Sequence, residues 1–183
     1  AQDAAEGCAP RRRAWLDALS ARALAALTAR AGGQHRGHRE VMASLDRAGG
    51  HLDAATGPPG ETEFFDQPRL CGMAGTAMLL LRDTGRARSL LGDALTRRSA
   101  ADVKGRALLM LDLAECSALD GEPEEAARFG SAALGMVGRS AVQPVLRRAR
   151  EVERSLQRWE GIPAVSDLGS HLAEVSRRPG TEG

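Results

Sequence analysis

Apolar residues recur along most of the chain three or four residues apart, which is the spacing of one face of an α-helix. The pattern is clearest at Ala87, Leu90, Leu91, Ala94 and Leu95. It predicts eight helices, over residues 11–30, 38–55, 70–81, 87–95, 103–119, 123–137, 142–158 and 163–175. No segment alternates polar and apolar residues as a half-buried strand does. The short connections predict antiparallel neighbours, and therefore four helical hairpins.

Residues suited to helix ends fall where this pattern begins or stops. Asp66 can cap the third helix, and Pro68 then lies in its first turn. Pro123 and Pro163 occupy the favoured first positions of the sixth and eighth helices. These residues support the same element boundaries as the apolar pattern does.

Glycine-containing segments separate the predicted helices, namely Gly32–Gly33, Asp83–Thr84–Gly85, Asp120–Gly121–Glu122 and Gly161. The strongest loop signal is Gly57-Pro58-Pro59-Gly60, because neither residue type continues a helix. Phe64 and Phe65 follow it, and we expect them to fold this loop onto the core.

Composition narrows the fold class. Hydrophobic residues make up 43% of the chain, but aromatic residues only 3%, and tyrosine is absent. A core of Ala, Leu, Val and Met suits close-packed helices, whereas strands favour aromatic and β-branched residues. We therefore expect an all-α protein. Lys104 is the single lysine among 25 basic residues, an arginine bias that suggests a GC-rich, actinobacterial genome.

Charge and cysteine usage exclude several classes of protein. The net charge of +1 argues against a nucleic-acid-binding protein, because such proteins usually present a strongly basic face. Cys8, Cys71 and Cys116 are too few and too widely spaced for a disulfide framework, and the last two read as buried thiols. No secretory signal and no membrane-spanning run is evident. We expect a cytoplasmic protein without membrane contact.

Two of the predicted hairpins repeat each other. The first contains Ala74-Gly75, Met78 and a glycine turn, followed by Ala87, Leu91 and Ala94. The second repeats this arrangement at Leu113-Ala114, Ser117, Gly121, Ala126, Gly130 and Ala133. Ala87 and Ala126 are 39 residues apart (126 − 87). The pattern resembles the tetratricopeptide repeat, in which paired helices stack into a right-handed solenoid.

A narrower resemblance covers most of residues 11–176. Phe64-Phe65-Asp66, the two repeats, and the segments Leu156–Trp159 and Ile162–Val165 look like the C-terminal half of actinobacterial helix-turn-helix (XRE-type) regulators. The resemblance implies a tetratricopeptide-like domain over residues 11–176, between disordered segments at 1–10 and 177–183. It also implies signal sensing or partner binding and possible homodimerisation, with the DNA-binding domain preceding residue 1.

In tetratricopeptide-like folds the first helix of each pair lines a concave groove. That resemblance implies a groove for a peptide, a protein or a small-molecule signal, lined by Trp15, Arg22, Arg69, Thr76, Leu79, Leu108, Leu111 and Glu115. Such a mixture of apolar residues and arginine suits an extended peptide or a partner helix. Each of these residues has an alternative role in the core or on a solvated face.

Other candidate sites have weaker support. Arg147, Arg148, Arg150, Arg154 and Arg158 form a basic helix, which we interpret as a solvated face with internal ion pairs rather than a nucleic-acid site. His35, His38 and His51 lack further ligands at metal-binding spacing. Cys116 beside Glu115 is expected to be a buried thiol rather than a nucleophile. The sequence therefore predicts no metal site, no cofactor and no catalytic residue.

Three hypotheses follow for the function. The chain is the signal- or partner-binding domain of a bacterial transcription regulator, which predicts that residues 1–183 alone do not bind DNA. Alternatively it is a free-standing adaptor, which predicts an open peptide groove. An enzyme on a helical-repeat scaffold is the third hypothesis, and it requires a polar pocket with perturbed titratable groups that the sequence does not reveal.

Overall fold

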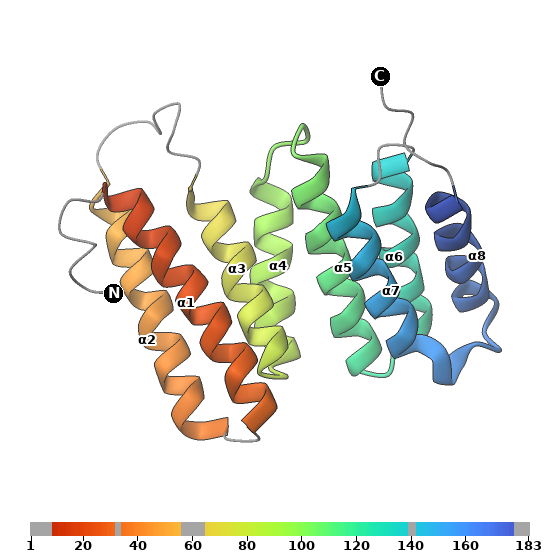
Figure 1. Ribbon diagram of the computed structural model, residues 1–183, viewed down its shortest axis with the longest axis horizontal. Helices are drawn as coiled ribbons and strands as arrows, with labels where there is room; N and C mark the ends of the chain where they lie inside the picture. The colour runs from red at the N-terminus through yellow and green to blue at the C-terminus, as the bar shows by residue number, and fades with distance from the viewer. Residues whose placement is uncertain (1–8, 32–33, 56–64, 139–141, 178–183) are drawn as a thin grey trace. The chain divides into compact units, whose positions relative to one another are not determined.

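The computed structural model describes residues 9–31, 34–55, 65–138 and 142–177. Within them all regular structure is helical and no strand occurs (Figure 1), which confirms the predicted class. The helices are α1 (Pro10–Ala31), α2 (Gln34–Asp53), α3 (Gln67–Leu80), α4 (Thr84–Arg97), α5 (Val103–Leu119), α6 (Pro123–Val137), α7 (Gln143–Leu156) and α8 (Pro163–Arg177), with a 3-10 turn at Gln157–Trp159. They form two compact units, residues 1–97 and 98–183.

In the first unit, α1 packs against α2 and α3, and α3 packs against α4. The buried face of α1 is made of small residues, Ala14, Ala18, Ala21, Ala25 and Thr28. Since alanine adds little bulk, this face allows the backbones of neighbouring helices to lie close together. Phe65 is buried in the same core, as predicted, whereas Phe64 and the Gly57–Gly60 loop lie outside the described residues.

The packing of α3 on α4 depends on a glycine. A Cβ atom added to Gly75 would lie 2.6 Å from Cγ of Leu91 on α4. That separation is shorter than any van der Waals contact, so a larger residue would force the two helices apart. The Ala74-Gly75 pair of the sequence repeat therefore marks a close approach of two helices.

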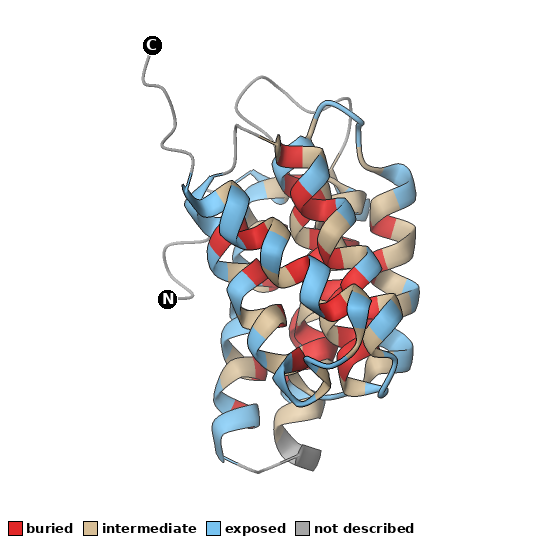
Figure 2. Cartoon of the chain, turned by 90° about the vertical axis from the view of Figure 1, so that its right-hand side faces the viewer, coloured by how far each residue is buried: buried red, intermediate tan, exposed pale blue. Residues whose placement is uncertain are grey.

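The second unit has a larger apolar core. In it α5 packs against α6 and α7, and α6 packs against α8. The largest buried side chains come from all four helices and include Leu111, Leu134, Val145, Val152, Leu156 and Leu168. Gly130 on α6 lies against Leu168 of α8, and a Cβ there would lie 3.0 Å from the tip of that side chain, a tight contact that a small shift of Leu168 would relieve. Buried and exposed residues alternate along the helices of this unit (Figure 2).

The α3–α4 and α5–α6 hairpins have the same type of turn. The amide of Asp83 donates to the carbonyl of Met78 at 3.0 Å, around a left-handed Arg82 with a φ of 63°. In the second hairpin Glu122 donates to Ser117 at 2.8 Å, around Gly121 with a φ of 80°. Both patterns are Schellman caps. The two left-handed residues are 39 residues apart (121 − 82), the same interval as in the sequence repeat.

Several helix boundaries confirm the sequence-based prediction and others correct it. Asp66 caps α3, since its carboxylate accepts from the amide of Arg69 at 2.9 Å. The predicted turn at Asp83–Gly85 is too long: the carboxylate of Asp83 accepts from the amide of Arg86, so Thr84 and Gly85 already belong to α4. The seventh helix ends at Leu156 rather than at Arg158. The Gly32–Gly33 break lies outside the described residues.

The predicted single domain over residues 11–176 stays a prediction. The segments expected to be disordered fall mainly outside the described residues, although Pro10 and Arg177 are the end residues of α1 and α8. In the described part of the chain, no helix combines the length and the apolar character that crossing a bilayer demands.

The two hairpin turns provide a test of their equivalence. Arg82 holds a positive φ that costs a non-glycine residue free energy, so Arg82→Gly should raise the free energy of unfolding by about 0.5 kcal/mol. Gly121→Ala should lower it by about 1 kcal/mol, because a Cβ there meets no neighbour and only the backbone is strained. Urea denaturation measures both changes.

Arg128→Gly is the matched control, because Arg128 is an exposed arginine inside α6. It should destabilise by about 1 kcal/mol, the usual cost of a glycine in a helix. If Arg82→Gly destabilised the protein to the same extent, the left-handed conformation of Arg82 would be contradicted.

Candidate functional site

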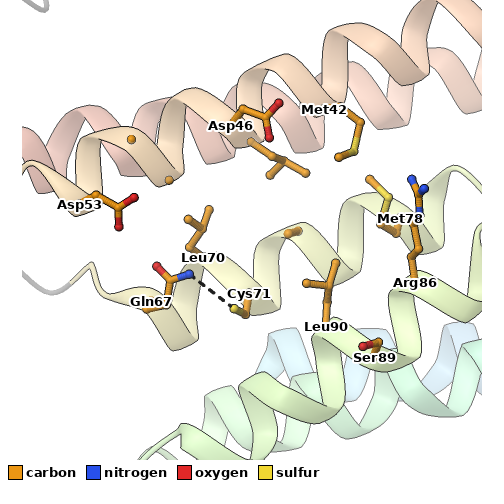
Figure 3. A pocket seen from close by; sticks show the side chains of 14 residues that line it. Met42, Asp46, Asp53, Gln67, Leu70, Cys71, Met78, Arg86, Ser89 and Leu90 are labelled. Carbon is orange, nitrogen blue, oxygen red and sulfur yellow. Dashed lines mark hydrogen bonds between the residues drawn. The ribbon is translucent and has the colours of Figure 1, made fainter.

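A groove of about 640 Å³ lies in the first unit between α2, α3 and α4 (Figure 3). Its apolar lining comprises Met42, Leu45, Leu70, Ala74, Met78 and Leu90. Met42 on α2 and Met78 on α3 approach each other near one end of the groove (Figure 3). Methionine side chains are flexible and polarisable, so they adapt to ligands of different shape.

Part of the α2 wall of the groove carries no side chains. Gly49 and Gly50 lie on α2 among the lining residues, and a Cβ atom added to either would meet nothing within 4 Å. Two consecutive glycines in a helix cost about 1 kcal/mol each relative to alanine. Here they leave open space on the groove side of α2.

The groove carries opposite charges at different places. Asp46 and Asp53 line the α2 wall, two turns of helix apart, and Asp53 lies toward the Gln67 end (Figure 3). Arg86 lies near Met78 at the other end, and its guanidinium forms an ion pair with Asp83 at 3.5 Å. The groove lining thus contains two carboxylates and one guanidinium, and the guanidinium already pairs with Asp83.

Cys71 lines the groove floor and is held in its protonated form. Its thiol donates a hydrogen bond to a carboxylate oxygen of Asp93 at 3.7 Å, and the amide of Gln67 donates to its sulfur at 4.0 Å. Burial, and then the negative charge and hydrogen bond of Asp93, raise the pKa of the Cys71 thiol. A raised pKa is unfavourable for nucleophilic chemistry, so Cys71 contributes shape rather than reactivity.

The groove residues predicted in the first unit have different surroundings. Trp15 is half-buried against the core around Phe65, and Arg22 is exposed. Arg69 forms a short ion pair with the capping Asp66, 2.7 Å apart, and the Thr76 hydroxyl donates to the Gly72 carbonyl. Leu79 is only 5% exposed, so the predicted exposure is wrong for this residue. None of these five residues lines the α2–α4 groove.

In the second unit, the predicted groove residues lie at the packed face between helices. Leu111 is fully buried, which contradicts its expected exposure, and Leu108 packs against the same core. The carboxylate of Glu115 accepts a hydrogen bond from the Ser155 hydroxyl of α7 at 3.2 Å. Whether any of the remaining six residues contacts a ligand stays a prediction.

The basic helix α7 is less solvated than its sequence suggests. Arg148 donates to the buried carboxylate of Asp112 at 2.8 Å and to Glu151 at 3.0 Å. Burial lowers the pKa of Arg148, but the charge and hydrogen bond of Asp112, with Glu115 and Glu151, outweigh it, so the pKa is raised. Arg158 stacks on the Trp159 ring at 3.7 Å. Arg148 is therefore a structural cation.

The other candidate residues carry no site in the described part of the chain. His51 faces Asp17 of α1 at 3.5 Å, and no cluster of three or more potential metal ligands occurs among the described residues. The side chain of His35 lies outside the described residues. Cys116 is fully buried, as predicted.

The groove lining on α2 was not predicted from the sequence. Met42, Asp46 and Asp53 were assigned no role, because the periodicity of α2 does not reveal which neighbour lies beside each face. One signal was available. Gly49-Gly50 lies in a segment that otherwise predicts a helix, and glycine inside a helix usually has a packing or functional role.

The thiol of Cys71 provides a measurable report on this site. Asp93→Asn removes a charge and a hydrogen bond that both raise the pKa of Cys71, so that pKa should fall and the thiolate should form at lower pH. The pH midpoint of iodoacetamide alkylation at Cys71, followed by peptide mass spectrometry, should shift downwards.

Arg97→Gln is the control of opposite sign, because the charge of Arg97 lowers the pKa of Cys71. This variant should move the midpoint upwards. A midpoint that is the same in both variants would show that Asp93 does not act on the thiol.

Comparison with known proteins returns no relative. No protein-family model, no curated protein and no solved structure matches this chain. Its function must therefore be inferred from the groove and from the helical repeat.

Proposed function

We propose that this chain is the signal-binding domain of a bacterial transcription regulator, and that the groove between α2, α3 and α4 holds the signal. The ligand we propose is a small molecule with an apolar body and a cationic group. The groove is the observation that carries this proposal, and the resemblance of residues 11–176 to regulator domains gives its biological setting. No DNA contact is assigned to residues 1–183.

The size and lining of the groove support a small-molecule ligand. Its volume of about 640 Å³ lies within the range of ligand pockets, roughly 300–1,000 Å³. The lining is mainly aliphatic and thioether carbon, with polar groups at only a few places. Pockets of this composition bind through apolar contact and use a few polar groups to fix orientation.

The charge of the α2 wall supports a cationic group on the ligand. Asp46 and Asp53 are both exposed residues, so each carboxylate is available at the groove edge. An ammonium group between the apolar floor and either one of these carboxylates would form charge-assisted hydrogen bonds. An anionic ligand would meet like charge along the same wall.

The position of the groove also supports a role in signalling. Its walls come from two successive hairpins, α1–α2 and α3–α4. A ligand that contacts α2 on one side and α3 and α4 on the other would favour one stacking of the hairpins over another. Helical-repeat domains transmit such shifts between neighbouring repeats, because each repeat contacts mainly its neighbours.

A free-standing adaptor for proteins or peptides is the second candidate. The observation that favours it is the row of exposed leucines on α1, Leu16, Leu19 and Leu27. An enzyme is less well supported, because the thiol that lines the groove has a raised pKa.

The groove proposal is tested with three ligands of equal chain length, n-octylammonium, n-octanoate and n-octanol. Octylammonium should bind most tightly in calorimetry and should protect Cys71 from alkylation. Gly49→Leu adds a side chain at a groove position where a Cβ meets nothing within 4 Å, and it should weaken binding about tenfold or more. Gly92→Leu is the matched control, since Gly92 is an α4 glycine with the same free space that does not line the groove.

The outcomes separate the parts of the proposal. If octanol bound as tightly as octylammonium, and Gly49→Leu still weakened binding, the apolar site would be retained and the cationic group of the ligand rejected. Equal effects of Gly49→Leu and Gly92→Leu would reject the site. Binding of long peptides alone would favour the adaptor.

The assignment of no DNA contact is tested separately. Residues 1–183 should shift no duplex in a gel assay with genomic promoter fragments at moderate salt, because their formal charge of +1 offers little counterion release. Tight, sequence-specific binding by this chain alone would contradict the proposal.

A further inference from the structure

Helix α1 is apolar on two opposite faces. Its inner face consists of the buried small residues that pack against α2 and α3. Its outer face carries Leu16, Leu19, Ala23 and Leu27, which fall within one stripe at helical spacing. The three leucines are 43%, 37% and 60% exposed. Three large apolar side chains are thus exposed on the face opposite the one that packs against α2 and α3.

The charges around this stripe have one sign. The sequence of α1 contains five arginines and a single acidic residue, Asp17. Asp17 is turned toward α2, where it pairs with Arg47 at 3.2 Å and with His51 at 3.5 Å. The remaining charges of α1 near the stripe are the exposed arginines Arg12, Arg22 and Arg30.

These arginines are distributed along the whole stripe. On a helical projection Arg12 and Arg30 lie at its two ends, and Arg22 lies beside Leu19. A ligand for this surface therefore needs an apolar strip about as long as α1, bordered by negative charge.

We propose that the outer face of α1, defined by Leu16, Leu19, Ala23 and Leu27, is the docking surface for an amphipathic helix of another protein, whose apolar stripe is bordered by Asp and Glu. Leucines spaced over three turns match the anchors by which one helix recognises another. Arginine borders suit carboxylates, which guanidinium groups bind through paired hydrogen bonds. Complementary charge of this kind also selects the partner.

A second copy of this chain fits the surface less well. An antiparallel pairing that sets Leu16 against Leu27 also brings Arg12 close to Arg30 of the other copy. A parallel pairing sets each arginine near its own counterpart. Either arrangement places like charges together, which is unfavourable.

An anionic membrane surface also fits less well. Helices that lie in a bilayer interface usually project tryptophan or phenylalanine into it. The aromatic residue of α1, Trp15, instead packs against the core formed by Ala14, Ala18 and Phe65.

The test uses two designed helical peptides of about 20 residues that share one leucine stripe. One has glutamate borders and the other has lysine borders, and binding of the fluorescent peptides to the full chain is followed by anisotropy. The glutamate peptide should bind at least about tenfold more tightly than the lysine peptide. Leu27→Glu should abolish this binding, and it should preserve the helical circular dichroism because Leu27 is the most exposed of the three leucines.

Val103→Glu serves as the matched control, since Val103 is an exposed aliphatic residue of the second unit. It should leave binding of the glutamate peptide unchanged. Arg12→Gln combined with Arg30→Gln should remove the preference for glutamate over lysine borders, which tests the charge argument with the leucines intact.

Four outcomes would overturn the proposal. Equal binding of both peptides would show that charge does not select the partner. Binding that persists in Leu27→Glu would show that the leucine stripe is not the docking surface. Concentration-dependent dimerisation that Leu27→Glu abolishes, without peptide binding, would assign the surface to a second copy. Binding to phosphatidylserine vesicles without peptide binding would assign it to a membrane.

Discussion

The close approach of neighbouring helices is the constraint on which the rest of this structure depends. The inner face of α1 is almost entirely alanine, and glycines stand where α3 meets Leu91 and where α6 meets Leu168. Small residues bury little apolar area each, so their contribution comes from dispersion across tightly packed backbones. This explains how a chain with only 3% aromatic residues can form cores in both units. It also means that enlarging Gly75 would force helices apart.

The same constraint explains where larger apolar side chains lie. When a helix presents alanine to its neighbours, its leucines and methionines must occupy the remaining faces. On α1 they lie on the outer surface, and in the groove Met42 and Met78 line a space that Gly49 and Gly50 leave open. Both exposed apolar regions lie beside charged residues, with arginines on α1 and carboxylates on the α2 wall. The two surfaces are therefore suited to ligands of opposite charge.

Helix positions could be predicted from the sequence because local chemistry determines them. Asp66 and Pro123 begin helices through their own capping or backbone geometry, whatever the tertiary structure is. The start of α4 was misplaced because Arg82 adopts a left-handed conformation normally taken by glycine. The burial of Leu79 and Leu111 was missed for another reason. Adjacent helical residues point about 100° apart, so a small rotation exchanges a groove-facing position for a core position.

Polar groups distinguish the two units. In the second unit, Arg148 of α7 is held by Asp112 of α5, and Glu115 of α5 accepts from Ser155 of α7. A buried ion pair adds little net stability but penalises any register that separates its charges, so these contacts fix how α5 and α7 align. The pairs that join α1 to α2 in the first unit, from Asp17 to Arg47 and His51, involve more exposed side chains and penalise displacement less. These first-unit pairs lie within one hairpin, whereas the contacts of Arg148 and Ser155 join α7 to the α5–α6 hairpin of the second unit.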